Sequence, residues 1–119
     1  MGTLIYHNPD CSKSRQTLAL LRQQGIEPDI ICYLSHQFSL EELKDLKQKL
    51  QLSSVRQMMR VKEQCYEQLD LANENLSEQA LFQAIIQNPI LLERPIVVKG
   101  NQAKIGRPPE AILAILSSS

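Results

Sequence analysis

The chain has 119 residues, of which 43% are apolar, and this length fits one compact domain over residues 1–119. Thirteen basic residues balance 13 acidic ones, and this neutrality argues against a binder of nucleic acid or of other polyanions. No apolar run approaches the ~20 residues of a membrane span, and residues 1–6 lack the basic flank of a signal peptide. We therefore expect a cytoplasmic protein that makes no contact with membranes.

The first third of the chain predicts a βαβ unit. Residues 3–7 are rich in β-forming side chains and lead into a turn. Residues 12–24 show the periodicity of a helix, and Gly25 is a natural stop for it. Residues 29–34 are apolar and β-branched, which is typical of a buried strand. Two strands joined by a crossover helix should run parallel.

The middle of the chain is predicted to be helical. Ser39 and Glu42 have the spacing of a capping box, and an apolar stripe follows them. The stripe consists of Leu40, Leu43, Leu46 and Leu50. A short helix over residues 54–59 and a longer one over residues 77–87 complete this part.

The last part predicts a hairpin and a closing helix. Residues 95–99 and 102–105 should form two antiparallel strands. Residues 110–116 should form a helix, and we expect residues 117–119 to be a frayed tail. The order of elements suits an α/β fold, namely a thioredoxin-like three-layer sandwich with a mixed four-stranded sheet and a helical insertion.

Cys11 is the strongest candidate for chemistry among the three cysteines, which form neither a disulfide framework nor a metal-binding pattern. It stands immediately before the predicted helix 12–24, where unpaired N–H groups and the helix dipole favour a thiolate. Placement alone leaves a small buried structural residue equally open. Cys32 lies in an apolar segment and is interpreted as a buried structural thiol, whereas no partner spacing gives Cys65 a role.

The neighbours of Cys11 exclude two other cysteine chemistries. Ser14 makes the motif C-x-x-S, so a local dithiol cannot form. Arg15 is too close to complete the C-x₅-R loop of cysteine phosphatases. His7, Lys13 and Arg15 are near enough in sequence to add positive charge around the thiolate. A lone thiolate would need its resolving thiol from another molecule.

Three arginines lie at boundaries between the predicted segments: Arg60, Arg94 and Arg107. The last two each precede a proline, which restricts the backbone there. Arginine forks bind tetrahedral oxyanions through paired donors. Taken singly, each is more typical of a solvated surface charge, and spacing alone does not bring them to Cys11.

Two long motifs resemble those of the glutaredoxin-coupled arsenate reductases. Residues 7–15, HNPDCSKSR, resemble the H-N-P-x-C-x-x-S-R signature of that family. Residues 88–98, NPILLERPIVV, resemble its later block, and Arg107-Pro108 matches its third arginine. The similarity extends from Thr3 to about Leu116 and is greatest to the short arsenate-reductase-related subgroup.

The resemblance implies a thioredoxin-like fold and the reduction of arsenate to arsenite. Cys11 would be the nucleophile, and His7 would help to keep its thiolate available. The oxyanion would be bound by Arg60, Arg94 and Arg107. Further residues expected to line the site are Asn8, Ser14, Arg15 and Pro95. The fold also implies a cis peptide bond at Arg94–Pro95.

The resemblance names two partners, glutathione as co-substrate and glutaredoxin as the second electron donor. It implies a monomer with no bound cofactor and no metal. One alternative is a regulator resembling the Spx proteins, which share the fold and bind RNA polymerase. Those proteins typically carry C-x-x-C, whereas this chain has Ser14. Another is a glutathione-linked reductase of a different substrate, since one fold serves several functions.

Overall fold

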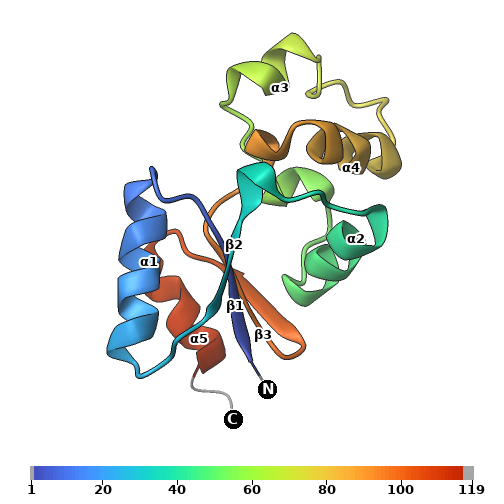
Figure 1. Ribbon diagram of the computed structural model, residues 1–119. Helices are drawn as coiled ribbons and strands as arrows, with labels where there is room; N and C mark the ends of the chain where they lie inside the picture. The colour runs from blue at the N-terminus through green and yellow to red at the C-terminus, as the bar shows by residue number, and fades with distance from the viewer. Residues whose placement is uncertain (1, 117–119) are drawn as a thin grey trace. The chain divides into compact units, whose positions relative to one another are not determined.

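The computed structural model describes residues 2–116, which group into two compact units (Figure 1). The sheet unit combines Met1–Leu34 with Arg94–Ser119, and the helical unit comprises Ser35–Glu93. The single domain expected from the length stays a prediction, and the expected tail at residues 117–119 lies outside the described residues. Across residues 2–116, no helix combines the length and the apolar character needed to cross a membrane.

The sheet unit contains a mixed four-stranded sheet in the order β2-β1-β3-β4, which confirms the prediction. Its strands are β1 (Thr3–His7), β2 (Asp29–Cys32), β3 (Ile96–Lys99) and β4 (Gln102–Ile105). Its helices are α1 (Ser12–Gln23), η4 (Pro109–Ile112) and α5 (Leu113–Leu116), and η1 (Tyr33–Ser35) begins at its edge. β1 pairs in parallel with β2 and antiparallel with β3, and β3 pairs antiparallel with β4.

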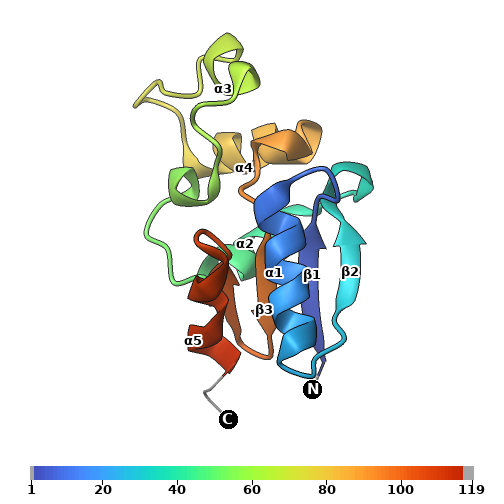
Figure 2. The same cartoon turned by 90° about the vertical axis from the view of Figure 1, so that its left-hand side faces the viewer.

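α1 and α5 cover the same face of the sheet (Figure 2). Ile5 of β1 and Val97 of β3 lie opposite each other in the register and are fully buried on this face. They pack against an apolar cluster supplied by the helices: Leu18, Leu21, Ile112 and Ile115. This buried layer fixes the N-terminus of α1 beside the carboxyl end of β1.

The interpretation of residues 29–34 as a buried strand is wrong. β2 ends at Cys32 and forms the outer strand of the sheet, with β1 as its neighbour. The apolar cluster beneath α1 draws on β1 and β3, so Ile30 of β2 stays 42% exposed. Cys32 is exposed too, which corrects its assignment as a buried thiol. Tyr33, the next residue, is the fully buried one.

The helical unit is organised around α4 (Glu78–Gln87), which contacts α2 (Leu40–Lys49), η2 (Val55–Met58) and η3 (Pro89–Leu91). Its buried side chains include Leu81, Ala84 and Ile85. α3 (Gln64–Gln68) was not predicted, because it has five residues and buries one of them, Tyr66. Such a short helix shows no hydrophobic periodicity.

Serines cap the helices of this unit, and Ser39 and Ser54 do so in different ways. Ser39 accepts a hydrogen bond from the Glu42 N–H, as predicted, but the Glu42 carboxylate binds His36. The reciprocal capping box occurs at η2, where Ser54 and Gln57 satisfy each other's backbone groups.

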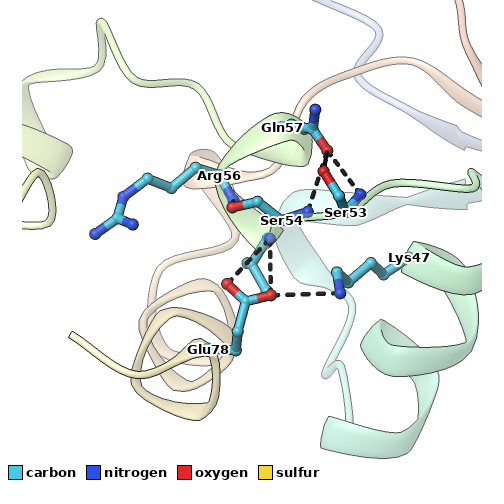
Figure 3. A network of polar contacts seen from close by, with 7 residues as sticks. Lys47, Ser53, Ser54, Arg56, Gln57 and Glu78 are labelled. Carbon is cyan, nitrogen blue, oxygen red and sulfur yellow. Dashed lines mark hydrogen bonds and ion pairs between the residues drawn. The ribbon is translucent and has the colours of Figure 1, made fainter. Parts of the chain in front are cut away.

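Glu78 joins three elements of the helical unit, as Figure 3 shows. Its carboxylate accepts a hydrogen bond from the Val55 N–H at 3.2 Å and pairs with the Lys47 ammonium at 3.3 Å. The Lys47 and Glu78 side chains are 24% and 46% exposed, so solvent screens the ion pair. The bond to the first N–H of η2 is the more specific of the two contacts.

Replacing Glu78 with Ala should therefore lower the free energy of unfolding by about 0.5–1.5 kcal/mol, since a backbone N–H loses its charged acceptor. Urea denaturation followed by circular dichroism measures this. Glu74→Ala is the control, because Glu74 is an exposed loop residue of the same charge. Equal stability of the two variants would show that the Glu78 contacts contribute nothing.

Candidate active site

Cys11 occupies the N-cap of α1, directly after the loop that leaves β1. Its backbone is extended (φ −99°, ψ 123°), so the chain turns into the helix at Ser12. The Cys11 N–H donates to the Asn8 carbonyl at 3.0 Å, and the Cys11 carbonyl accepts from the Arg15 N–H at 3.0 Å. These two bonds fix the sulfur beside the free amide groups of the first helical turn.

The surroundings of Cys11 stabilise its thiolate. Partial burial alone would raise the pKa of the thiol, but the N–H groups of Ser14 and Lys13 and the guanidinium of Arg94 outweigh it. The pKa of Cys11 is therefore below the ordinary value. Because the thiolate is the nucleophile, this is the environment of a reactive cysteine and not of a structural one.

Two of the three predicted arginines meet at Cys11. Arg107 Nη2 lies 3.6 Å from the Cys11 sulfur, and Arg107 Nε donates to the Arg94 carbonyl at 2.8 Å. Arg94 adds its own hydrogen bond and charge to the sulfur. The end of β4 and the start of β3 thus deliver two guanidinium groups to one thiolate, as a site for an anionic substrate requires.

Arg94 is held by a residue that the sequence analysis did not single out. Its Nη1 donates to the Tyr33 hydroxyl at 3.1 Å. Its Nε is buried and finds no acceptor among the described residues. Tyr33 follows β2, which runs parallel to β1. Because parallel strands end at the same edge of a sheet, residues following β2 were candidates for the site, and this signal could have found Tyr33.

His7 is buried and hydrogen bonded to Ser14 of the first turn of α1. Burial, and then the charges of Arg22 and Arg15, lower the pKa of His7 and so disfavour its cationic form. The buried Ser14 hydroxyl accepts from the Asn8 N–H at 3.0 Å and hydrogen bonds to His7 Nδ1. The lowered pKa argues against a positive charge on His7, and its catalytic role stays a prediction.

The other predicted neighbours shape the loop before α1. Arg15 Nη1 donates to the Pro9 carbonyl at 2.8 Å, and the Asn8 side chain accepts from the Asp10 N–H at 3.0 Å. Arg15 is thus engaged with the loop backbone. Asn8 acts through its backbone and its amide oxygen to place Cys11.

Pro95 and Gly106 close the site on the side of the hairpin. The Arg94–Pro95 bond is cis, as predicted, and so is Arg107–Pro108. The Gly106 N–H donates to the Pro95 carbonyl at 2.9 Å. A Cβ at Gly106 would lie 2.6 Å from Thr17 Oγ1 and 2.9 Å from Pro95 Cγ. Glycine is therefore required for the close approach that brings Arg107 to Cys11.

Arg60 lies in the helical unit. Its Nε donates to Glu63 at 2.9 Å, and its N–H donates to the Leu91 carbonyl at 2.7 Å. Its role in oxyanion binding stays a prediction. Cys65 is half-buried in α3, and Cys32 is exposed on β2.

The fold and the site define a class: small α/β proteins with one activated cysteine before a helix, facing arginines that suit an oxyanion. The sequence profile of the ArsC family matches residues 6–115, and the chain belongs to this family. A protein of Haemophilus influenzae named "Arsenate reductase" is 54% identical over 98% of this chain and 100% of its own length. One of Neisseria meningitidis with the same name is 51% identical over 94% of this chain and 96% of its own.

A solved structure supports the same membership. The "Arsenate reductase from Vibrio cholerae" superimposes with a TM-score of 0.95 at 56% identity. The match covers 97% of this chain and 98% of that one.

The environment of Cys11 predicts the order in which the cysteines react. At about pH 6.5, iodoacetamide should modify Cys11 before Cys32, although Cys32 is the more exposed, because only a thiolate reacts quickly. The rate at Cys11 should rise with pH around a midpoint below the ordinary pKa of cysteine. Peptide mapping after limited alkylation measures both. Modification in order of exposure, with Cys32 first, would contradict an activated Cys11.

Proposed function

We propose that this protein is an arsenate reductase with Cys11 as its nucleophile. The observation that carries the proposal is the contact of a stabilised thiolate with Arg94 and Arg107. A structural cysteine has no use for two guanidinium groups, whereas a thiolate that must meet an anion does. The names of the relatives in Haemophilus influenzae and Neisseria meningitidis support arsenate as that anion.

In the first step the Cys11 thiolate attacks arsenic. A sulfur–arsenic bond forms, and one arsenic–oxygen bond breaks as the oxygen takes up protons and leaves as water. Arg94 and Arg107 offset the repulsion between the thiolate and the oxyanion and stabilise the charge on the remaining oxygens. Membership of the ArsC family is the ground on which Arg60 is proposed as a third guanidinium.

Reduction then needs two thiols from outside the chain. Position 14 carries a serine whose hydroxyl is fully buried and hydrogen bonded to His7, so it cannot resolve an adduct on Cys11. A glutathione thiol would displace a second oxygen of the adduct as water and form a sulfur–arsenic bond. A glutaredoxin thiolate would then attack the glutathione sulfur, so that a disulfide forms as this sulfur–arsenic bond breaks and arsenic(V) takes up its electron pair. Water would finally hydrolyse the bond between arsenic(III) and Cys11, which releases arsenite and returns the thiol. The proposal includes a cytoplasmic monomer without a bound cofactor.

Turnover of cysteine variants tests the nucleophile. Cys11→Ser should abolish arsenate reduction with glutathione and glutaredoxin, because a serine alkoxide is scarcely populated at neutral pH. The double variant Cys32→Ser/Cys65→Ser should keep it, since neither thiol belongs to the described site. Arsenite release and glutathione oxidation measure the reaction.

Two outcomes would contradict the proposal. Loss of activity in a folded double variant would overturn the single-thiol mechanism. No arsenate turnover by wild-type protein whose Cys11 alkylates readily would favour a reductase of another substrate.

The arginines provide a second test. Arg94→Ala and Arg107→Ala should each lower kcat/KM for arsenate about ten- to hundredfold, the loss expected for one charge-assisted contact. Lysine at either position should restore only part, since an ammonium cannot reproduce a fork. Urea denaturation confirms that folding is retained, and Arg56→Ala is a control that removes an arginine of the helical unit from backbone contacts. Near-normal kinetics in both site variants would refute oxyanion binding by Arg94 and Arg107.

A further inference from the structure

Tyr33 is a buried phenol whose hydroxyl reaches the site. It is 0% exposed and stands one residue after the end of β2, at the same edge of the sheet as the end of β1. Its ring belongs to the packed interior, and its hydroxyl accepts the hydrogen bond from Arg94 Nη1. Buried tyrosine hydroxyls usually have a partner, and here the partner is a guanidinium that stabilises the nucleophile.

The bond to Tyr33 fixes how the Arg94 fork is turned. The guanidinium of an arginine can rotate on its flexible side chain unless one of its donors is held by a hydrogen bond. With Nη1 bound to Tyr33 and Nε buried, the plane of the group is set. The Arg94 backbone carbonyl in turn accepts from Arg107 Nε, and Arg107 contacts the Cys11 sulfur. Both arginines at Cys11 therefore depend on the orientation of Arg94.

A neutral acceptor also preserves the charge of Arg94. Arg60 shows the contrasting arrangement, because its Nε is paired with the Glu63 carboxylate at 2.9 Å. A carboxylate on Arg94 would cancel much of its attraction for a thiolate and an oxyanion, whereas a phenol hydroxyl orients the group and leaves its charge in place.

We propose that Tyr33 is a positioning residue for oxyanion binding, which aims the Arg94 guanidinium at Cys11 and its substrate without neutralising it. This inference rests on the proposed function. It adds that the affinity of the site for an anion depends on a buried residue that acts through the guanidinium of Arg94.

The test is Tyr33→Phe, which keeps the buried ring and removes only the hydroxyl. The readout is protection of Cys11 from iodoacetamide by arsenate, titrated without any reducing partner. The half-protecting arsenate concentration should rise about three- to tenfold, the effect of losing one hydrogen bond that orients a charged group. The pH midpoint of Cys11 alkylation without arsenate should also move upward, because Arg94 no longer stabilises the thiolate as well.

Tyr66→Phe is the matched control, since it removes a hydroxyl from another buried ring, in α3. It should change neither the protection nor the pH midpoint. In an Arg94→Ala background, Tyr33→Phe should have no further effect on either readout, because its partner is gone. An additive effect in that background would overturn a role through Arg94.

Unchanged protection and an unchanged pH midpoint in a folded Tyr33→Phe variant would refute the positioning role and leave the proposed function intact. Absence of arsenate protection in the wild type would instead refute arsenate binding. The pH midpoint of the variant would then still decide whether Tyr33 seats Arg94 beside Cys11.

Discussion

Keeping a thiolate charged beside an anionic substrate is the constraint on which the rest of the site depends. Two negative groups in contact repel each other strongly unless fixed positive charge surrounds them. The amide groups of Lys13 and Ser14 supply part of it, and Arg94 and Arg107 supply the rest. The groups that supply this positive potential are fixed in place, because they belong to the N-terminus of α1, to the start of β3 and to the end of β4.

The sheet unit makes this arrangement possible through its topology. The crossover from β1 to β2 places the N-terminus of α1 at the carboxyl end of β1, and β3 runs antiparallel to β1. The start of β3 and the end of β4 therefore lie at that same edge, where Arg94 and Arg107 stand. Residues separated by more than 90 positions in the chain converge because of strand direction alone.

Local patterns predicted β1, α1, β3 and β4 to within a residue or two, because these segments combine clear periodicity with strong stop signals. Cys11 could be singled out because a helix start has an electrostatic consequence. The burial of β2 could not be predicted in the same way. An apolar strand in the middle of a sheet and one at its edge have similar sequences, and only the strand order distinguishes them.

Tyr33 and His7 likewise show properties of the site that local sequence patterns could not predict. The sequence places Tyr33 after an apolar run, but its contact with Arg94 spans 61 positions of chain. The charge of His7 depends on burial and on Arg22, which is 15 residues further along the chain, and neither is visible in the motif itself. Oxyanion binding by Arg60 is predicted only from the family resemblance and stays a prediction.

The close contact at Gly106 has a consequence for engineering. Any side chain there would collide with Thr17 of α1 and with Pro95, so the segment that carries Arg107 has no room to shift. A library meant to widen the range of anions accepted should therefore leave position 106 fixed. Substitutions are better placed at side chains around Arg94 and Arg107. A change there alters the shape of the site without displacing the hairpin that supports it.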